Sequence, residues 1–144
     1  MLLNNNRNVS YQEIGDADKA AADFARFVAS KDNDEKYVFR LAPLLVQIDN
    51  IEGYHRHCAK LIARFRMTDN PIMAAQTVKA SLIIPPSTET LKAAAQLADK
   101  ALTIDPSHWL IRHAEFAKGL AEFRNGSYQG AIDWCGKRLA GPSV

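Results

Sequence analysis

The sequence contains few of the residues that interrupt helices and strands, with seven glycines and six prolines among its 144 residues. Most of them fall between segments of helical periodicity, which favours an all-helical chain with short connections. Aromatic residues are also scarce, at 8%, although 47% of the residues are hydrophobic. Such a chain is globular rather than disordered, and its core has to be built mainly from alanine, leucine and isoleucine.

Only two cysteines, Cys58 and Cys135, are present, far apart and with apolar neighbours. This predicts buried, reduced thiols in a reducing compartment instead of a disulfide framework. The first residues, MLLNNNRN, lack the apolar segment of a signal peptide, and no apolar run approaches the roughly 20 residues that span a bilayer. We therefore expect a soluble, cytoplasmic protein with no membrane partner. The net charge of +2 is too small to indicate a nucleic-acid partner.

Motifs of catalysis and metal binding are also missing. The sequence has no nucleophile elbow, no CxxC and no phosphate-binding loop. His55 and His57 are two residues apart and His108 and His113 are five apart, spacings that do not place both rings on one helix face. We expect His55 and His57 to lie on a solvated basic face and His108 to face water. The sequence predicts a protein that is not an enzyme, with no catalytic residue, no metal ligand and no cofactor.

The most informative stretch that is present is residues 91–106, LKAAAQLADKALTIDP. Ala94, Ala98 and Ala101 recur at the three- and four-residue steps of one helix face, beside leucines. Small side chains on a core-facing stripe let another helix approach closely. The proline of Asp105-Pro106 then ends the helix, because it disfavours helical geometry at the preceding residue.

The remaining periodicity divides the chain into helices with recognisable ends. The expected caps are Asn70 before Pro71, Ser87 or Thr88, and Ser107, and Asn125-Gly126 is an expected helix end. Pro43 implies a kink, unless its helix begins only near that residue. The expected helices run over residues 16–30, 35–48, 51–65, 72–84, 88–103, 107–124 and 127–139.

The first of these helices, GDADKAAADFARFVAS, is expected to begin at Asp16. Its expected apolar stripe consists of Ala20, Phe24, Phe27 and Val28. Because it lacks a full preceding partner helix, we expect Phe24 and Phe27 to be only partly covered. Exposed apolar surface of this kind predicts weak self-association or a missing upstream repeat.

The helices align on themselves with a period near 34 residues. Ala20 corresponds to Tyr54 and Phe24 to Cys58, each 34 residues on, and Ala94 corresponds to Ala131 after 37. A helix–turn–helix unit with this period resembles the tetratricopeptide repeat (TPR) family. The last copy matches most fully, through Gly119, Phe123, Gly126, Tyr128, Ala131, Ile132 and Leu139.

The resemblance covers nearly the whole chain as one TPR-like domain, residues 1–144. It implies an all-α, right-handed array of antiparallel helical hairpins, about six or seven helices in all. The array consists of a half-repeat, 1–30, and hairpins over about 35–66, 70–104 and 107–140. The sequence departs from the family at Tyr54, where alanine is preferred, and another helical-hairpin array stays an alternative.

The segments RLAPLLV, IEGYHRHC and DKALTIDP also resemble repeat regions attached to some bacterial serine/threonine protein kinases. The chain carries no kinase motif, neither a glycine-rich loop nor HRD or DFG. This second resemblance therefore speaks to context and implies no activity.

In the TPR family the first helix of each hairpin lines a concave groove that binds peptides. The resemblance therefore implies a protein–protein interaction module whose groove holds fixed positive charges and apolar residues, suited to an acidic peptide with an apolar anchor. The groove positions are Lys36, Phe39, Arg40 and Pro43 from one hairpin, Gln76, Lys79 and Ile83 from the next, and His113, Phe116, Leu120 and Arg124 from the last.

Three alternatives to peptide binding stay open at this point. The basic residues are equally typical of ordinary helix surface. The chain could also be a regulatory or spacer segment of a larger bacterial signalling protein, such as a protein kinase, with no ligand of its own. RNA binding by helical repeats would need a stronger basic stripe than +2 supplies.

Overall fold

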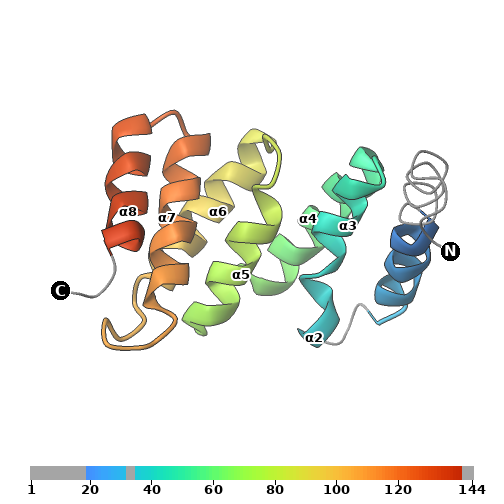
Figure 1. Cartoon of the computed structure of the whole chain (residues 1–144), viewed down its shortest axis with the longest axis horizontal. Coiled ribbons are helices and arrows are strands. Elements are labelled where there is room, and N and C mark those ends of the chain that lie inside the picture. The colour runs from blue at the N-terminus through green and yellow to red at the C-terminus, as the bar shows by residue number, and fades with distance from the viewer. Residues whose placement is uncertain (1–18, 32–34, 141–144) are drawn as a thin grey trace, which may run out of the picture. The chain divides into compact units, whose positions relative to one another are not determined.

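The computed structural model describes residues 19–31 and 35–140, of which 35–36 and 137–140 are described by their backbone alone. Every regular element in these residues is a helix, and they contain no strand, which confirms the expected all-α class (Figure 1). No helix within these ranges is long and apolar enough to cross a membrane. The chain divides into two compact units, residues 1–54 and 55–144, which are treated separately below.

The first unit contains a helical segment over residues 19–29, α2 (Glu35–Val38), α3 (Leu41–Gln47) and the start of α4 (Ile51–Phe65). The expected helix over 35–48 is interrupted at Phe39 and Arg40. Pro43 is the third residue of α3. Because the first N–H groups of a helix have no intrahelical partner, proline removes no hydrogen bond there. The alternative that the helix begins near Pro43 is confirmed.

The helical segment 19–29 buries a different face from the expected one. Its buried side chains are Ala21, Ala25 and Val28. Of the expected stripe, Ala20 is exposed, and Phe24 and Phe27 are 39% and 45% exposed. The expected stripe was therefore wrong apart from Val28. The buried face of this helix is formed by the small residues Ala21 and Ala25 together with Val28, and the two phenylalanines lie beside this face. The partial exposure of Phe24 and Phe27 is confirmed, whereas the expected cap Asp16 lies outside the described residues.

A tight turn joins α3 to α4. Asp49 has a left-handed φ of 61°. Its N–H bonds the Val46 carbonyl and the N–H of Asn50 bonds the Leu45 carbonyl, which together form a Schellman motif. The Asn50 side chain then caps α4 by accepting the Gly53 N–H at 2.9 Å.

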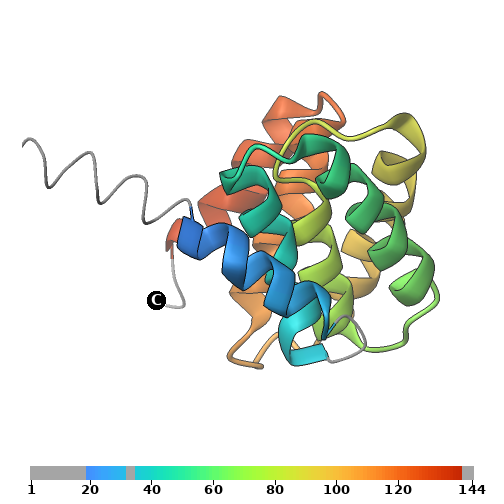
Figure 2. The same ribbon diagram turned by 90° about the vertical axis from the view of Figure 1, so that its right-hand side faces the viewer.

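The second unit is built around α5 (Pro71–Ser81), α6 (Thr88–Ala101), α7 (Ile111–Arg124) and α8 (Tyr128–Ala140). Helix α5 packs on α6 and α7 packs on α8, while α7 also contacts both α5 and α6. Two perpendicular views show these helices of the second unit (Figures 1 and 2). Because short connections join successive neighbours, the unit consists of stacked antiparallel helical hairpins.

Two of the expected helix starts are confirmed. The Asn70 side chain accepts the N–H groups of Ile72 and Met73, directly before Pro71 at the first helical position. Ser87 accepts the Thr90 N–H at the start of α6. The third was wrong, because α7 begins at Ile111 instead of after Ser107.

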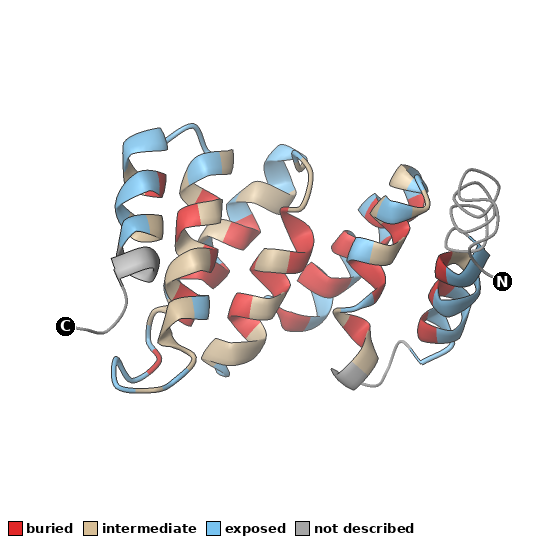
Figure 3. Cartoon of the chain, viewed as in Figure 1, coloured by how far each residue is buried: buried red, intermediate tan, exposed pale blue. Residues whose placement is uncertain are grey.

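The core of the second unit consists mostly of alanine. Ala94, Ala98 and Ala101 are fully buried, as expected from their stripe, and Ala131 is 7% exposed. Buried residues face one another between the helices (Figure 3). The buried cluster consists of Ile62, Ala74, Ala75, Val78, Leu82, Ala93, Ala94, Leu97, Ala98, Ala101, Ile104, Ala114, Ala117 and Ala121.

Glycine serves the same close packing between α7 and α8. A Cβ atom added at Gly119 would lie 3.0 Å from the Cys135 Sγ and 3.4 Å from the Ala131 carbonyl oxygen. Helix α8 therefore approaches the backbone of α7 at a position where only glycine fits without adjustment.

The expected burial of the two cysteines and the expected exposure of His55 and His57 are each confirmed for one residue and wrong for the other. Cys58 is buried, 4.0 Å from the Ala80 carbonyl oxygen, whereas Cys135 is only half-buried. His55 is exposed, but His57 is 6% exposed, so the expected solvated face does not include it. The reason is that His57 lies beside Cys58 on the buried side of α4.

We expect Ala98→Leu to lower the free energy of unfolding by about 1–3 kcal/mol, because the added atoms have no space between closely packed helices. Chemical denaturation measures the change. The control is Gln96→Leu, which adds a leucine at an exposed position of the same helix. Equal stability of the two variants would contradict the assignment of the buried face.

Helix α7 ends at a glycine in the left-handed conformation. Gly126 has φ of 83°, and the N–H groups of Gly126 and Ser127 bond the carbonyls of Phe123 and Glu122. This is again a Schellman motif, and it confirms the helix end expected at Asn125-Gly126.

Gly126→Ala is expected to cost about 1 kcal/mol, because L-residues are strained in the left-handed region. Gly136, inside α8, is the matched control, since a Cβ atom at either glycine meets nothing within 4 Å. Gly136→Ala should raise stability by up to about 1 kcal/mol, the helix-propensity difference between the two residues. Thermal melts with the same sign for both variants would contradict this explanation.

Candidate functional site

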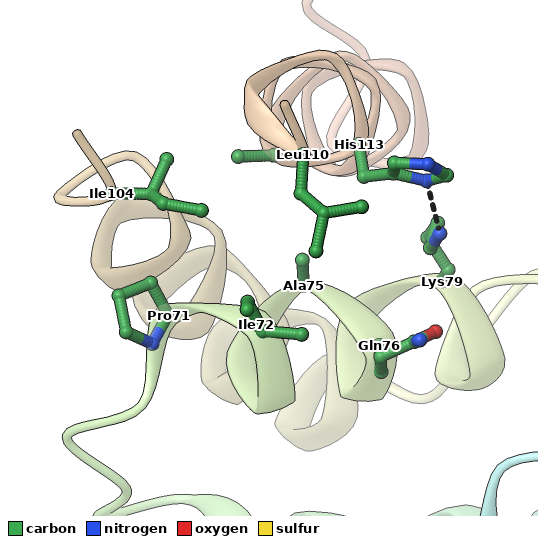
Figure 4. A pocket seen from close by; sticks show the side chains of 9 residues that line it. Pro71, Ile72, Ala75, Gln76, Lys79, Ile104, Leu110 and His113 are labelled. Atoms are coloured by element: carbon green, nitrogen blue, oxygen red, sulfur yellow. Dashed lines mark hydrogen bonds between the residues drawn. The ribbon is translucent and has the colours of Figure 1, made fainter. Parts of the chain in front are cut away.

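A small apolar pocket lies in the second unit, between α5 and α7. Its volume is about 50 Å³, which accommodates part of a side chain but not a whole metabolite, for which pockets are about 300–1,000 Å³. Apolar side chains from α5 and from the connection between α6 and α7 converge on it (Figure 4). It is lined by Pro71, Ile72, Ala75, Gln76, Lys79, Ile104, Leu110, His113 and Ala114.

Helix α5 forms the floor of the pocket, and the residues at its N-terminus set its direction. The Asn70 cap and Pro71 set the direction of its first turn. Ile72, Ala75, Gln76 and Lys79 then follow at three- and four-residue steps, which place them along one face. The small side chain of Ala75 leaves space into which Leu110 points from the start of α7 (Figure 4).

The wall of the pocket depends on the turn formed by residues 105–110. The Asp105 carboxylate accepts hydrogen bonds from the N–H and the hydroxyl of Ser107, each at 2.9 Å. These hydrogen bonds, and to a lesser degree the nearby His108, lower the pKa of Asp105 below its ordinary value of 3.8. The carboxylate is therefore ionised at neutral pH and holds the turn in place.

His108 completes this turn. Its Nδ1 accepts the backbone N–H of Leu110 at 3.0 Å, and its ring stacks on Trp109 with centroids 6.0 Å apart. The imidazole thereby supplies an acceptor just before α7, where Leu110 itself makes no side-chain cap. The expectation that His108 simply faces water was wrong, since the ring is half-buried and hydrogen-bonded.

Lys79 and His113 meet at the rim of the pocket. The Lys79 Nζ lies 3.0 Å from the His113 Nδ1 (Figure 4). An ammonium group only donates hydrogen bonds, so Nδ1 accepts and the neutral imidazole carries its proton on Nε2. Two of the expected groove residues, from different hairpins, are thus brought together, and they present N–H donors beside an apolar pocket.

Arg124, another expected groove residue, is bonded to the backbone. Its Nε donates to the Leu82 carbonyl at 3.1 Å and its Nη2 to the Ile83 carbonyl at 2.9 Å. These carbonyls follow the end of α5, where intrahelical partners run out. The guanidinium therefore ties the end of α5 to the end of α7.

The other expected positions lie elsewhere. Lys36, Phe39 and Arg40 belong to the first unit, in α2, in the break after it and at the position before α3. Pro43 is exposed in α3 of the same unit. In the second unit, Ile83 follows α5, while Phe116 and Leu120 are half-buried on α7 and outside the pocket lining.

Sequence reasoning missed the apolar residues that form the pocket, above all Ile104 and Leu110. It placed the start of α7 at Ser107, which would have put Leu110 inside a helix. The available signal was Asp105-Pro106-Ser107, because an aspartate side chain commonly bonds the backbone two residues on and proline favours the turn between them.

The site offers apolar side chains and N–H donors. Among the residues that the structure describes, no group of three or more His, Cys, Asp or Glu side chains is placed to hold a metal ion. Comparison with known proteins finds no family model, no curated protein and no solved structure that matches the chain.

We expect Arg124→Met to lower the free energy of unfolding by about 1–3 kcal/mol, because two carbonyls lose charged donors while the aliphatic stem is kept. Arg66→Met, which removes a charge at an exposed position, is the control and should have little effect. Urea denaturation of both variants measures the difference. A fully stable Arg124→Met protein would show that the guanidinium does not tie the helix ends together.

Proposed function

We propose that the chain is a TPR-like helical-repeat module that binds a peptide segment of a partner protein, and that the pocket between α5 and α7 is the anchoring site. The observation that carries this proposal is the pairing of an apolar pocket with N–H donors at its rim. The stacked hairpins of the second unit, with α5 and α7 as the first helices of adjacent hairpins, support the TPR-like part.

The lining defines the chemistry of the ligand. Ile72, Ile104 and Leu110 favour an aliphatic side chain, and the small volume of the pocket, about 50 Å³, suits a single one. Beside it, the ammonium of Lys79 and the Nε2–H of His113 suit a carboxylate oxygen. The preferred segment has an aliphatic residue next to Asp or Glu.

The affinity of such a segment should be modest. One small pocket buries little apolar area, and the charged contact at the rim is exposed, where an ion pair contributes about 0.2–1 kcal/mol. Salt should weaken binding further, because screening acts strongly on exposed charges.

The spacer function is the second candidate, and the internal bonds of the basic residues favour it. Lys79 bonds His113 and Arg124 bonds backbone carbonyls. Basic side chains that stabilise the hairpin stack need no external ligand. A binding experiment therefore separates the two functions.

The proposal is tested by selecting a random peptide library on the immobilised protein at pH 7.5 and low salt. We expect the enriched peptides to share an aliphatic residue next to Asp or Glu. Fluorescence anisotropy of one such peptide should show weaker binding to Lys79→Gln, which keeps the stem and loses the charge. Replacing the aliphatic residue of the peptide by serine should weaken binding as well.

Lys92→Gln is the matched control, since Lys92 is an exposed lysine on α6 outside the pocket. It should bind as the unaltered protein does. Absence of any enriched peptide, or equal binding by the Lys79 and Lys92 variants, would count against the pocket and in favour of the spacer function.

A further inference from the structure

Both histidines at the pocket accept a hydrogen bond at Nδ1. His113 accepts from the Lys79 ammonium and His108 accepts from the Leu110 N–H, each at 3.0 Å. Only the neutral imidazole has such an acceptor, because both ring nitrogens donate once the ring is protonated. One contact at the rim of the pocket and one contact in the turn that carries Leu110 therefore exist only with neutral histidines.

We propose that the turn 105–110 is a pH-sensitive switch, in which protonation of His108 releases Leu110 and opens the wall of the pocket. In the neutral state the imidazole holds the Leu110 N–H. In the protonated state Nδ1–H faces that same N–H, and two donors cannot bond each other. Histidine is the side chain whose charge ordinarily changes between about pH 5 and 8, so this is the range in which the switch is tested.

The turn also contains the group that would bind His108 in its protonated state. Asp105 is close enough for His108 to affect its ionisation electrostatically, and its carboxylate stays ionised in this pH range. The imidazolium can therefore exchange the Leu110 N–H for the Asp105 carboxylate. Two alternative partners within one short turn make a two-state element, which a switch requires.

Other charged side chains on or beside α5, α6 and α7 also have partners. Lys79 faces His113 from α5. The remaining pairs are Lys100 of α6 with Asp69, Arg112 with Glu115 on α7, and Lys118 of α7 with Asp99 of α6.

His113 responds to acid in a different way. Its protonation removes the acceptor for Lys79 and places two cations side by side, which strengthens attraction for a carboxylate at the rim. His108 controls the apolar wall, so the two histidines have opposite effects on an acidic ligand. Variants of each are needed to separate these effects.

The switch is tested without any ligand, so its outcome is independent of whether a peptide binds. NMR of the ¹⁵N-labelled protein can detect the scalar coupling across the Leu110 N–H···Nδ1 hydrogen bond. We expect this coupling at pH 8, together with a nuclear Overhauser contact between the methyl groups of Leu110 and Ala75. Both should disappear at pH 5.5 as the His108 ring becomes protonated.

His108→Asn is the matched variant, because an asparagine oxygen accepts the N–H two residues on and does not titrate. It should keep the Leu110–Ala75 contact at both pH values. His113→Gln, which keeps an acceptor for Lys79, should lose the contact at pH 5.5 as the unaltered protein does.

Two results would overturn the switch. One is a Leu110–Ala75 contact in the unaltered protein that persists at pH 5.5 while His108 is protonated. The other is a contact that His108→Asn loses at the same pH as the unaltered protein.

Regulation of peptide binding by this switch rests on the proposed function. For a neutral aliphatic peptide, lowering the pH from 8 to 5.5 should weaken binding about fivefold, which corresponds to the loss of one hydrogen bond. The His108→Asn variant should bind this peptide equally well at both pH values.

Discussion

The close approach of helices through alanine and glycine is the constraint on which the second unit depends. Ala94, Ala98 and Ala101 have no exposed surface, and the backbone of α7 at Gly119 leaves no space for a methyl group beside α8. Small side chains bury little apolar area each, so stability has to come from backbones packed at short distance. This explains how a chain with so few aromatic residues forms a core, and why its helices tolerate little added volume.

The pocket follows from the same packing. Ala75 on α5 leaves a gap in the layer between α5 and α7, and the turn 105–110 delays the start of α7 so that Leu110 points toward that gap (Figure 4). Hydrogen bonds to Asp105 and His108 hold this turn. The apolar wall at Leu110 and the His108 acceptor therefore share one short connection between α6 and α7, whereas the rim donors Lys79 and His113 lie on α5 and α7.

Arg124 and Lys79 show how basic residues serve the fold and a surface at once. The guanidinium of Arg124 satisfies carbonyls at the end of α5, and Lys79 bonds an imidazole on the neighbouring hairpin. A basic side chain on the first helix of a hairpin therefore does not by itself indicate a ligand. The apolar pocket beside Lys79 distinguishes that position from Arg124, whose donors already meet backbone oxygens.

The sequence by itself determined the helical class, most helix ends and the alanine stripe, because these depend on local rules: periodicity, caps at Asn70 and Ser87, and the glycine at 126. It also identified Lys79 and His113 as residues of one surface, although only through a resemblance to a repeat family. Tertiary structure alone decided which face of residues 19–29 is buried, that Arg124 bonds carbonyls of another helix, and that Ile104 and Leu110 enclose a pocket. These features depend on which backbone comes close to which, and neighbouring residues in the chain do not encode such distances.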